Sequence, residues 1–299
     1  MQKITPNLWF DGNAKEAADY YTSIFPNSEI TKTVNYPTSK EEGLTDFQLN
    51  LAGKPLTIDF RLEDMDFVAI NAGPEFKFNS ANSFEVHFNS TADKDAKEKV
   101  TKLWESLTDG GKIIAPLGDN YGFVELYGQV IDRYGLLWHL AATAVPEDQD
   151  YHFIVPSLGF SGPVVNKASE ACDYYTSVFK DSEAGPKMPY PEHQAPLTAE
   201  SLMYSTFTID GQAFTAHDSD EDDTFNEAVS YMVLCKNQEE IDYLWDKLSA
   251  VPESEQCGWC KDKYGVSWQI VPENMDELMA KPDAYKTMMK QHKIVIAEY

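Results

Sequence analysis

The amino-acid sequence predicts an α+β protein that contains two tandem copies of one module, each made of paired βαβββ units. Three observations predict this fold. Similar blocks of residues recur in the same order in the two halves of the chain. The repeat period, about 130–150 residues, is the size of a domain, and 299 residues accommodate two such domains. Within each half, a strand, a helix and three strands are followed by the same order again.

Several matched blocks define the repeat. They are 4–12 (ITPNLWFDG) with 154–162 (IVPSLGFSG), 19–25 (DYYTSIF) with 173–179 (DYYTSVF), 51–54 (LAGK) with 209–212 (IDGQ), and 132–140 (DRYGLLWHL) with 262–270 (DKYGVSWQI). Matched blocks in one order rarely arise by chance. We therefore expect domains at residues 1–146 and 152–280, a short linker rich in proline and acidic residues, and a C-terminal tail at 281–299.

The first unit begins with an expected strand from Ile4 to Phe10. A helix follows, in which apolar residues recur at helical spacing from Ala14 to Phe25, and Pro26 ends it. Residues 47–51 and 55–60 read as a hairpin across Ala52-Gly53, with a third strand near 67–71.

The second unit starts with an alternating strand at 83–88. Apolar residues from Ala96 to Leu107 predict an amphipathic helix that ends at Gly110-Gly111. The expected strands then are 112–116, 123–130 and 136–142. The second half repeats this order, and Asn237 with Glu240 is placed to cap its late helix. Residues 275–299 read as a helical tail ending in an added strand or a docked segment at 294–296.

The composition argues against two classes of partner. A formal charge of −25 disfavours nucleic acid and anionic membranes. No apolar run is long enough for a membrane helix, and the N-terminus has no apolar signal region, so we expect a cytoplasmic protein. Four cysteines in a chain of this length fit reduced thiols better than a disulfide scaffold.

At this point the chain resembles a known family. The stretches that carry the resemblance are ITPNLWFDGNAKEAADYYTSIFPNSEI, NAGPEFKF, EEIDYLWDKLS and QCGWCKDKYGVSWQIVP. They resemble the PhnB-like branch of the vicinal-oxygen-chelate superfamily, which includes glyoxalases, bleomycin-resistance proteins and dioxygenases. Members of this branch are often labelled 3-demethylubiquinone methyltransferase-like, although methyl transfer is not the activity we expect.

The resemblance implies a curved mixed β-sheet with a concave cavity in each domain. Enzymes of the superfamily usually hold a divalent metal there, which polarises a substrate with adjacent oxygens. Other members only sequester small molecules. The usual metal ligands come from the first, fifth and eighth strands, and these positions fall on Pro6 and Pro156, near Ser83 and Ser230, and on His139 and Gln269. The usual ligand triad is therefore absent from both halves.

One alternative ligand set exists in the first half. Ser83, Glu85 and His87 alternate along one strand and so share one of its faces. If this face lines the cavity, Glu85 and His87 look toward His139, and the three would suit Zn, Ni, Fe or Mn. The alternative is a hydrogen-bonded polar trio in a wet cavity.

The remaining cavity candidates are weaker. They are Pro6, Leu8 and Trp9 of the first strand, His217 beside the acidic run 218–223, and Ser230 and Gln269. Trp259 is a further aromatic residue that could line a pocket. The Cys257-Gly-Trp-Cys260 motif stands alone and precedes a strand, which favours neither zinc nor thioredoxin chemistry.

The sequence thus predicts a superfamily protein that binds an unassigned small molecule in its sheet cavity. One alternative is a metal-dependent lyase, isomerase or dioxygenase that uses Glu85, His87 and His139. Another is a metal-free, resistance-type sequestering protein, and a third is that one half is structural and only supports the other. The duplication predicts an intrachain pseudo-dimer, with a homodimer of whole chains as a further option.

Overall fold

The computed structural model describes residues 2–119, 122, 124–146 and 151–299 of the chain. The first half contains β1 (Ile4–Phe10), α1 (Ala14–Ile24), β2 (Glu29–Asn35), the 3-10 helix η1 (Asp46–Leu51), β3 (Pro55–Leu62), β4 (Met65–Asn71), β5 (Asn82–Asn89), α2 (Ala96–Thr108), β6 (Lys112–Gly118), β7 (Leu126–Ile131) and β8 (Leu137–Thr143). The predicted order of strand, helix and three strands, repeated once, is confirmed. The predicted start of one strand at Phe123 and part of the linker, 147–150, lie outside the described residues.

The second half repeats this order with one predicted strand missing, because the 3-10 helix η3 follows α4 where the first half has β6, and it adds a tail. It contains β9 (Ile154–Phe160), η2 (Gly162–Val164), α3 (Ala168–Val178), β10 (Glu183–Pro189), β11 (Leu202–Ile209), β12 (Gln212–Asp218), β13 (Val229–Cys235), α4 (Gln238–Leu248), η3 (Pro252–Ser254), β14 (Trp259–Lys261), β15 (Ser267–Pro272), α5 (Met275–Met279), α6 (Ala284–Met288) and η4 (Ile296–Glu298). The predicted cap of α4 is present, because the Asn237 side chain accepts from the Glu240 backbone N–H at 3.0 Å.

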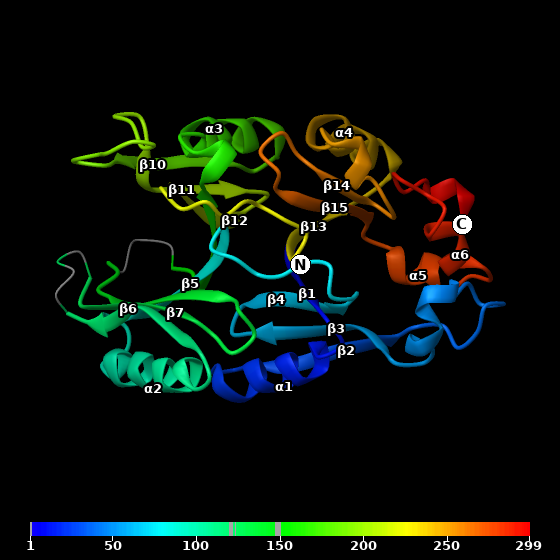
Figure 1. Cartoon of the computed structure of the whole chain (residues 1–299), viewed down its shortest axis with the longest axis horizontal. Helices are drawn as coiled ribbons and strands as arrows, with labels where there is room; N and C mark the ends of the chain where they lie inside the picture. Colours follow the sequence, from blue (N-terminus) through cyan, green and yellow to red (C-terminus); the bar gives the residue numbers. More distant parts are fainter. Residues whose placement is uncertain (1, 120–121, 123, 147–150) are drawn as a thin grey trace.

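Two curved sheets organise the molecule, and each takes one unit from each half, although the second-half unit of sheet A has two strands after its helix instead of three (Figure 1). Sheet A has the strand order β14-β15-β13-β1-β4-β3-β2, and sheet B has β10-β11-β12-β9-β5-β8-β7-β6. The two halves join through antiparallel pairing of β1 with β13 in sheet A and of β5 with β9 in sheet B. The halves therefore form an intrachain pseudo-dimer, and neither sheet exists without both.

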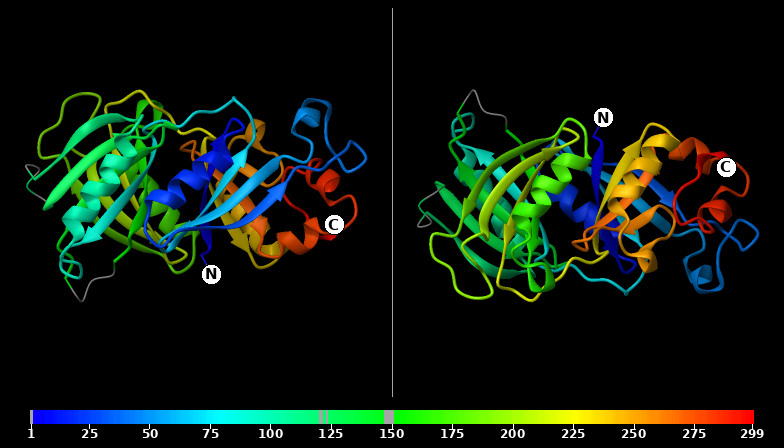
Figure 2. Two further views of the ribbon diagram at one scale, coloured as in Figure 1. Left: turned by 90° about the horizontal axis from the view of Figure 1, so that it is seen from below. Right: turned by 90° about the horizontal axis from the view of Figure 1, so that it is seen from above.

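The helices cover the outer face of each sheet and leave the other face, here called the inner face, to the interior of the curve (Figure 2). In sheet A, α1 packs on β3 and β4, and α4 packs on β15. In sheet B, α3 packs on β11, and α2 packs on β7 and β8. Because side chains alternate along a strand, one residue in two faces the helices and the next faces inward.

The matched blocks that define the repeat build one buried network in each half. Asp132 is 3% exposed, and its carboxylate accepts hydrogen bonds from the Tyr21 hydroxyl (2.7 Å), the Trp138 indole N–H (2.8 Å) and the backbone N–H groups of Tyr134 and Leu136. Burial raises the pKa of Asp132, and these donors oppose the rise. The recurring Asp-x-Tyr-Gly sequence is therefore structural.

The second half contains the same network around Asp262. Its carboxylate accepts from Tyr175 at 2.7 Å, from Trp268 at 2.8 Å and from the backbone N–H groups of Tyr264 and Val266. Asp262 is 1% exposed. The two networks fix the same helix, turn and strand in both halves.

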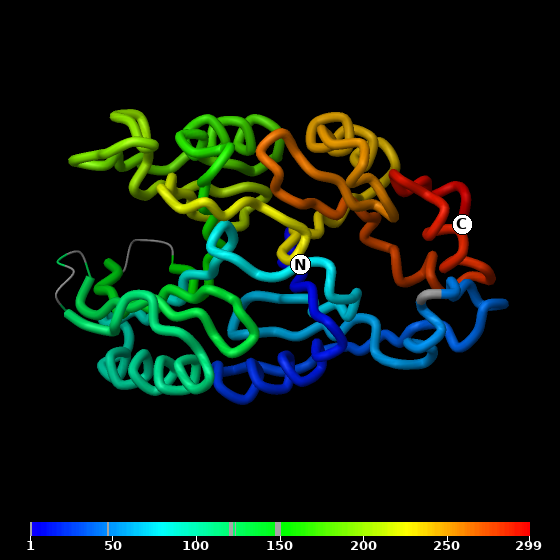
Figure 3. Tube along the Cα trace, viewed as in Figure 1, coloured from blue at the N-terminus to red at the C-terminus, as the bar shows by residue number. Residues whose placement is uncertain are grey.

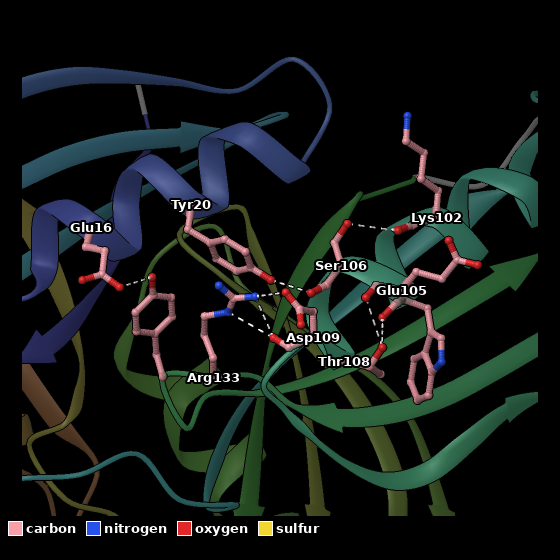
Figure 4. Close-up of polar contacts among 10 residues, drawn as sticks. Glu16, Tyr20, Lys102, Glu105, Ser106, Thr108, Asp109 and Arg133 are labelled. Atoms are coloured by element: carbon pink, nitrogen blue, oxygen red, sulfur yellow. Dashed lines mark hydrogen bonds and ion pairs between the residues drawn. The ribbon is translucent and has the colours of Figure 1, made fainter.

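A second set of polar contacts joins α1, α2 and the β7–β8 turn on the outer side (Figure 4). The Arg133 guanidinium lies 4.5 Å from the centre of the Tyr20 ring and donates to the Asp109 carbonyl oxygen at 2.8 Å. The Tyr20 hydroxyl donates to the Ser106 carbonyl oxygen at 2.6 Å. In the second half Lys263 takes the place of Arg133, with its ammonium 4.4 Å from the centre of the Tyr174 ring.

Three local predictions were wrong or incomplete. Residues 46–51 form a 3-10 helix rather than a strand, because Thr45 and Gln48 form a capping box at its start. The hairpin is formed by β3 and β4, and its turn is Glu63-Asp64. This turn, and not Ala52-Gly53, corresponds to the Asp210-Gly211 turn between β11 and β12. Strand β2 was missed because its side chains are mostly exposed.

The C-terminal tail first passes the β2 edge of sheet A, where Asp276 pairs with Lys32, and its later residues return to the β14 edge (Figure 3). Backbone N–H groups of Cys257 and Gly258 donate to the Gln291 and His292 carbonyls at 2.7 Å each. Near the opposite edge, the Gln48 amide lies 3.2 Å from the Tyr285 hydroxyl. The end of the chain is a docked segment and not an added strand, because Ile294 is fully buried and residues 296–298 form a 3-10 turn.

Candidate functional site

A polar network occupies the inner face of sheet B. It combines residues from both halves of the chain, because β5, β7 and β8 come from the first half and β11 and β12 from the second. Its members are Glu85 and His87 of β5, Tyr127 and Gln129 of β7, His139 of β8, Tyr204 of β11, and Thr215 and His217 of β12. The sequence predicted Glu85, His87, His139 and His217 as candidates but did not single out the others.

Glu85 lies at the centre of this network and is 8% exposed. Its Oε1 accepts from the Thr215 hydroxyl at 2.6 Å, and its Oε2 accepts from the Tyr204 hydroxyl at 3.1 Å. His87 Nε2 lies 3.2 Å from Oε2. Burial raises the pKa of Glu85, but the His87 hydrogen bond, the neighbouring imidazoles and the Thr215 hydroxyl outweigh burial and lower the pKa to about 2. The carboxylate is therefore ionised at neutral pH.

His139 lies beside Glu85 on the neighbouring strand β8. The Gln129 amide donates to the Tyr127 oxygen at 2.8 Å, and the Tyr127 hydroxyl lies 2.9 Å from His139 Nδ1. We assign the Tyr127 hydroxyl hydrogen to this contact, which makes Nδ1 the acceptor and leaves the proton of the neutral ring on Nε2. Burial, with the imidazoles of His217 and His87, lowers the pKa of His139 to about 4 against the opposing effect of Glu85.

His217 lies on the same face, next to a glycine on the neighbouring strand. It pairs with Gly159 of β9, where an added Cβ would lie 3.2 Å from His217 Nε2 and 3.0 Å from the Ser80 carbonyl oxygen. Burial lowers the pKa of His217. Asp218, the first residue of the acidic run, points to the opposite face, where it accepts from the backbone N–H groups of Ala168 (3.1 Å) and Leu202 (2.8 Å). It caps α3 and is not a ligand.

Polar atoms without a partner converge on this inner face. Among the described residues, His139 Nε2, Ser83 Oγ and Ser157 Oγ are buried and have no hydrogen-bond partner. Ser83 and Ser157 lie opposite each other on β5 and β9. Because buried polar groups are almost always satisfied, these atoms need a water molecule or a ligand.

The predicted metal set of Glu85, His87 and His139 does not fit an ion as it stands. Within the described part of the chain, no three or more His, Cys, Asp or Glu side chains are placed to hold a metal ion. Glu85 instead accepts from Thr215 and Tyr204, and His139 Nδ1 is engaged by Tyr127. The structure places the three residues on one face of sheet B, where His87 contacts Glu85 at 3.2 Å and His139 contacts Tyr127 instead.

Sheet A carries different residues at the corresponding positions. The equivalents of Glu85 and His87 are Met232 and Leu234, those of Thr215 and His217 are Val68 and Ile70, and that of His139 is Gln269. The Gln269 amide donates to the Ser230 hydroxyl at 2.9 Å, so these two predicted candidates contact each other. Sheet A therefore cannot repeat the polar network of sheet B.

Aromatic rings take up space on the inner face of sheet A. The Trp9 ring lies 5.0 Å from the Phe76 ring and 6.1 Å from the Trp259 ring, edge to face in both cases. Trp9 also donates to the Gly73 carbonyl oxygen at 2.7 Å. Gly159 stands in sheet B where sheet A has Trp9, and Gln129 stands where it has Trp259.

Two first-strand candidates face the helices rather than the inner face. Leu8 is 1% exposed within the hydrophobic core, and Pro6 has the same parity and pairs with the core residue Tyr231. The register inferred from the sequence was therefore shifted by one residue. Asn7 and Ser157 hold the inward positions that were given to Pro6 and Pro156.

The two cysteines of the C-x-x-C motif point to different surroundings. Cys260 is 1% exposed in the core, whereas Cys257 is partly buried with its sulfur 3.8 Å from the Met289 sulfur. Burial raises the pKa of Cys257 to about 11, and it also raises that of Cys260. Neither thiol is activated as a nucleophile.

A separate recess of about 350 Å³ lies between the hairpin tips 64–65 and 210–212, near the starts of β1 and β9. Its lining includes Lys3, His152 and Asp210 but none of the network residues on sheet B. It therefore does not enlarge the polar site. No helix among the described residues is long and apolar enough to cross a membrane.

One known protein family matches both halves of the chain. The family model for 3-demethylubiquinone-9 3-methyltransferase matches residues 2–141 and again 152–271. No curated protein matches the chain.

Several solved structures are similar to parts or most of the chain. A putative 3-demethylubiquinone-9 3-methyltransferase, PhnB protein, from Bacillus cereus is 30% identical, covering 48% of this chain and 100% of its own, with a TM-score of 0.39. A protein from Pseudomonas aeruginosa is 20% identical over the same shares, also with a TM-score of 0.39. Glyoxalase I from Zea mays is 11% identical but covers 91% of this chain and 94% of its own, with a TM-score of 0.52, and so shares the two-domain fold. The chain thus belongs to the PhnB-like, 3-demethylubiquinone-9 3-methyltransferase family, present twice on a vicinal-oxygen-chelate fold.

Proposed function

We propose that the protein binds a small organic molecule on the inner face of sheet B, with His139 Nε2–H donating to an oxygen of that molecule. The observation that carries this proposal is the convergence of unpartnered buried polar atoms at His139, Ser83 and Ser157. An unsatisfied buried donor costs about 1–3 kcal/mol, which a ligand acceptor would recover. The two serine hydroxyls can serve as donor or acceptor and so tolerate several ligand shapes.

The charges of the site favour a neutral or cationic ligand. Glu85 is ionised, whereas the lowered pKa values leave His139 and His217 neutral at pH 7. The inner face therefore carries negative charge, on a chain whose net charge is −25. An anionic ligand would be repelled locally and over long range.

The same pKa values favour binding over proton-transfer catalysis. A general base works best with a pKa near the working pH. Glu85, with a pKa of about 2, and His139, with a pKa of about 4, are weak bases at pH 7. A metal-free binding protein, one of the functions expected from the sequence, is thus the one that this site supports best.

A screen of uncharged carbonyl compounds tests this proposal. Ketones, tertiary amides and N-substituted lactams, which carry an acceptor but no hydrogen-bond donor, are added singly, and binding is measured by thermal shift and ligand-observed NMR. Hits should lose at least about tenfold in affinity in His139→Ala, because a donor to the ligand is gone. Gln269→Ala, the matched change on sheet A, should keep the affinity. Hits that bind equally well to both variants would refute the assignment to sheet B.

A further inference from the structure

One end of sheet A's inner face holds a polar pair that sheet B lacks. The Lys261 ammonium of β14 lies 2.9 Å from Glu227 Oε1, and both side chains are less than one-fifth exposed, at 19% and 17%. The corresponding residues in sheet B are Ile131 and Ser80. The pair is therefore a separate feature and not a remnant of the polar network.

Two buried oxygens beside this pair have no hydrogen-bond partner among the described residues. They are Glu227 Oε2 and Ser267 Oγ. Ser267 is 1% exposed and pairs with Lys261 on one side and with Ser230 on the other, so it lies between β14, which carries Lys261, and β13, which begins just after Glu227. A buried carboxylate oxygen without a donor is costly, and Lys261 keeps donors beyond the one used on Oε1. The site thus offers an acceptor and a donor next to each other.

Aromatic surface adjoins the polar pair. Trp259 lies two residues before Lys261 on the same face of β14, and Trp9 donates its backbone N–H to the Ala228 carbonyl at 2.9 Å, next to Glu227. The two indoles meet at 6.1 Å, and Phe76 lies on the other side of Trp9. These three side chains keep part of their surface exposed. Partly exposed rings of this kind bind flat apolar groups.

We infer that this end of sheet A is a second ligand site, for a flat aromatic molecule whose polar head carries a hydrogen-bond donor beside an acceptor. The donor binds Glu227 Oε2, the acceptor binds Lys261 and Ser267, and the ring packs against Trp9 and Trp259. A primary carboxamide is the simplest neutral head with this pattern. The site does not depend on the function proposed for sheet B, because no residue is shared.

Three matched probes test the head group. Phenylacetamide has donor and acceptor, phenethylamine has only a donor, and phenylacetate has only acceptors. Binding to the full chain is measured by ligand-observed NMR and calorimetry. Phenylacetamide should bind most tightly, and phenylacetate most weakly because it meets Glu227 with like charge. Equal binding of all three, or none by phenylacetamide, would overturn the inference.

Three variants locate the binding. Glu227→Gln should weaken phenylacetamide by about tenfold, the loss expected for one hydrogen bond to a charged group. Trp259→Ala should weaken it, whereas Trp259→Phe, which keeps a ring, should largely restore it and so excludes simple misfolding. Glu85→Gln on sheet B should leave it unchanged. Loss of phenylacetamide binding in Glu85→Gln with retention in Glu227→Gln would place the probe on sheet B and refute this site.

Discussion

The inner faces of sheets A and B have the same backbone plan and opposite chemistry. On sheet B, Glu85 and His87 contact each other and His139 bonds to Tyr127, whereas on sheet A the positions of Glu85 and His87 hold Met232 and Leu234. Beneath both faces, the Asp132 and Asp262 networks are alike to within 0.1 Å in their side-chain hydrogen bonds, at 2.7 and 2.8 Å in each. The two halves therefore share the residues that hold the fold and differ in those that line the inner faces.

The largest expected effect tests the shared part of this comparison. Asp132→Ala and Asp262→Ala should each lower the free energy of unfolding by about 4 kcal/mol, because each leaves several buried donors without an acceptor. Urea unfolding measures both. Asp109→Ala, which removes an exposed ion pair with Arg133, should cost less than about 1 kcal/mol. A large loss of unfolding free energy in only one of the two aspartate variants would show that the two buried networks do not stabilise the halves equally.

A smaller effect separates the two faces at acidic pH. The pKa of Glu85 is lowered in the folded state from 4.5 to about 2, which corresponds to up to about 3 kcal/mol of stability. This contribution is fully present above about pH 4.5 and is lost as the pH falls through about 2. The stability difference between the native chain and Glu85→Gln, measured by urea unfolding, should therefore shrink over that range. Met232→Gln on sheet A should show no such pH dependence; an equal dependence would contradict the comparison.

The next effect appears between neutral and mildly acidic pH. The pKa of His139 is lowered from 6.5 to about 4 in the folded state. Between about pH 6.5 and pH 4, His139 therefore binds a proton in the unfolded chain but stays neutral in the folded chain. Its contribution to stability should fall by about 2 kcal/mol from pH 7 to pH 5. His139→Gln, which copies the residue of sheet A, should remove this decrease in urea unfolding. Gln269→His should introduce a similar one, and identical pH profiles for all three chains would argue against a buried neutral imidazole.

The smallest expected effect concerns metal ions. Since no suitable ligand group lies among the described residues, Zn²⁺, Ni²⁺, Fe²⁺ and Mn²⁺ should not bind in stoichiometric amount at the polar network. Equilibrium dialysis followed by elemental analysis measures this. One ion per chain that is lost in both His87→Ala and His139→Ala would restore the metal-dependent enzyme as the better account and would bring sheet B close to the superfamily enzymes.

The sequence predicts the fold well because the residues that recur between the halves are those that hold the fold together. Tyr21, Asp132 and Trp138 recur as Tyr175, Asp262 and Trp268, and these residues bond to one another in both halves. Their spacing is fixed by hydrogen bonding, so it survives divergence elsewhere.

The site is predicted only in part, for two physical reasons. The alternation of Glu85 and His87 identifies one strand of the network, but Tyr204 and Thr215 reach Glu85 from the other half, and nothing in the sequence indicates that β5 pairs with β9. The inward parity of β1 also depends on which face the helices cover, and an error of one residue moved the prediction from Asn7 to Pro6.

The most direct test of the account is the protonation state of His139, because the proposed ligand contact requires a neutral ring with its proton on Nε2. Nitrogen-15 NMR of histidine-labelled protein, assigned with His139→Gln, reports both the tautomer and the pKa. The account predicts the Nε2–H tautomer at pH 7 and titration near pH 4. A ring protonated on Nδ1, or one that titrates near 6.5, would contradict it.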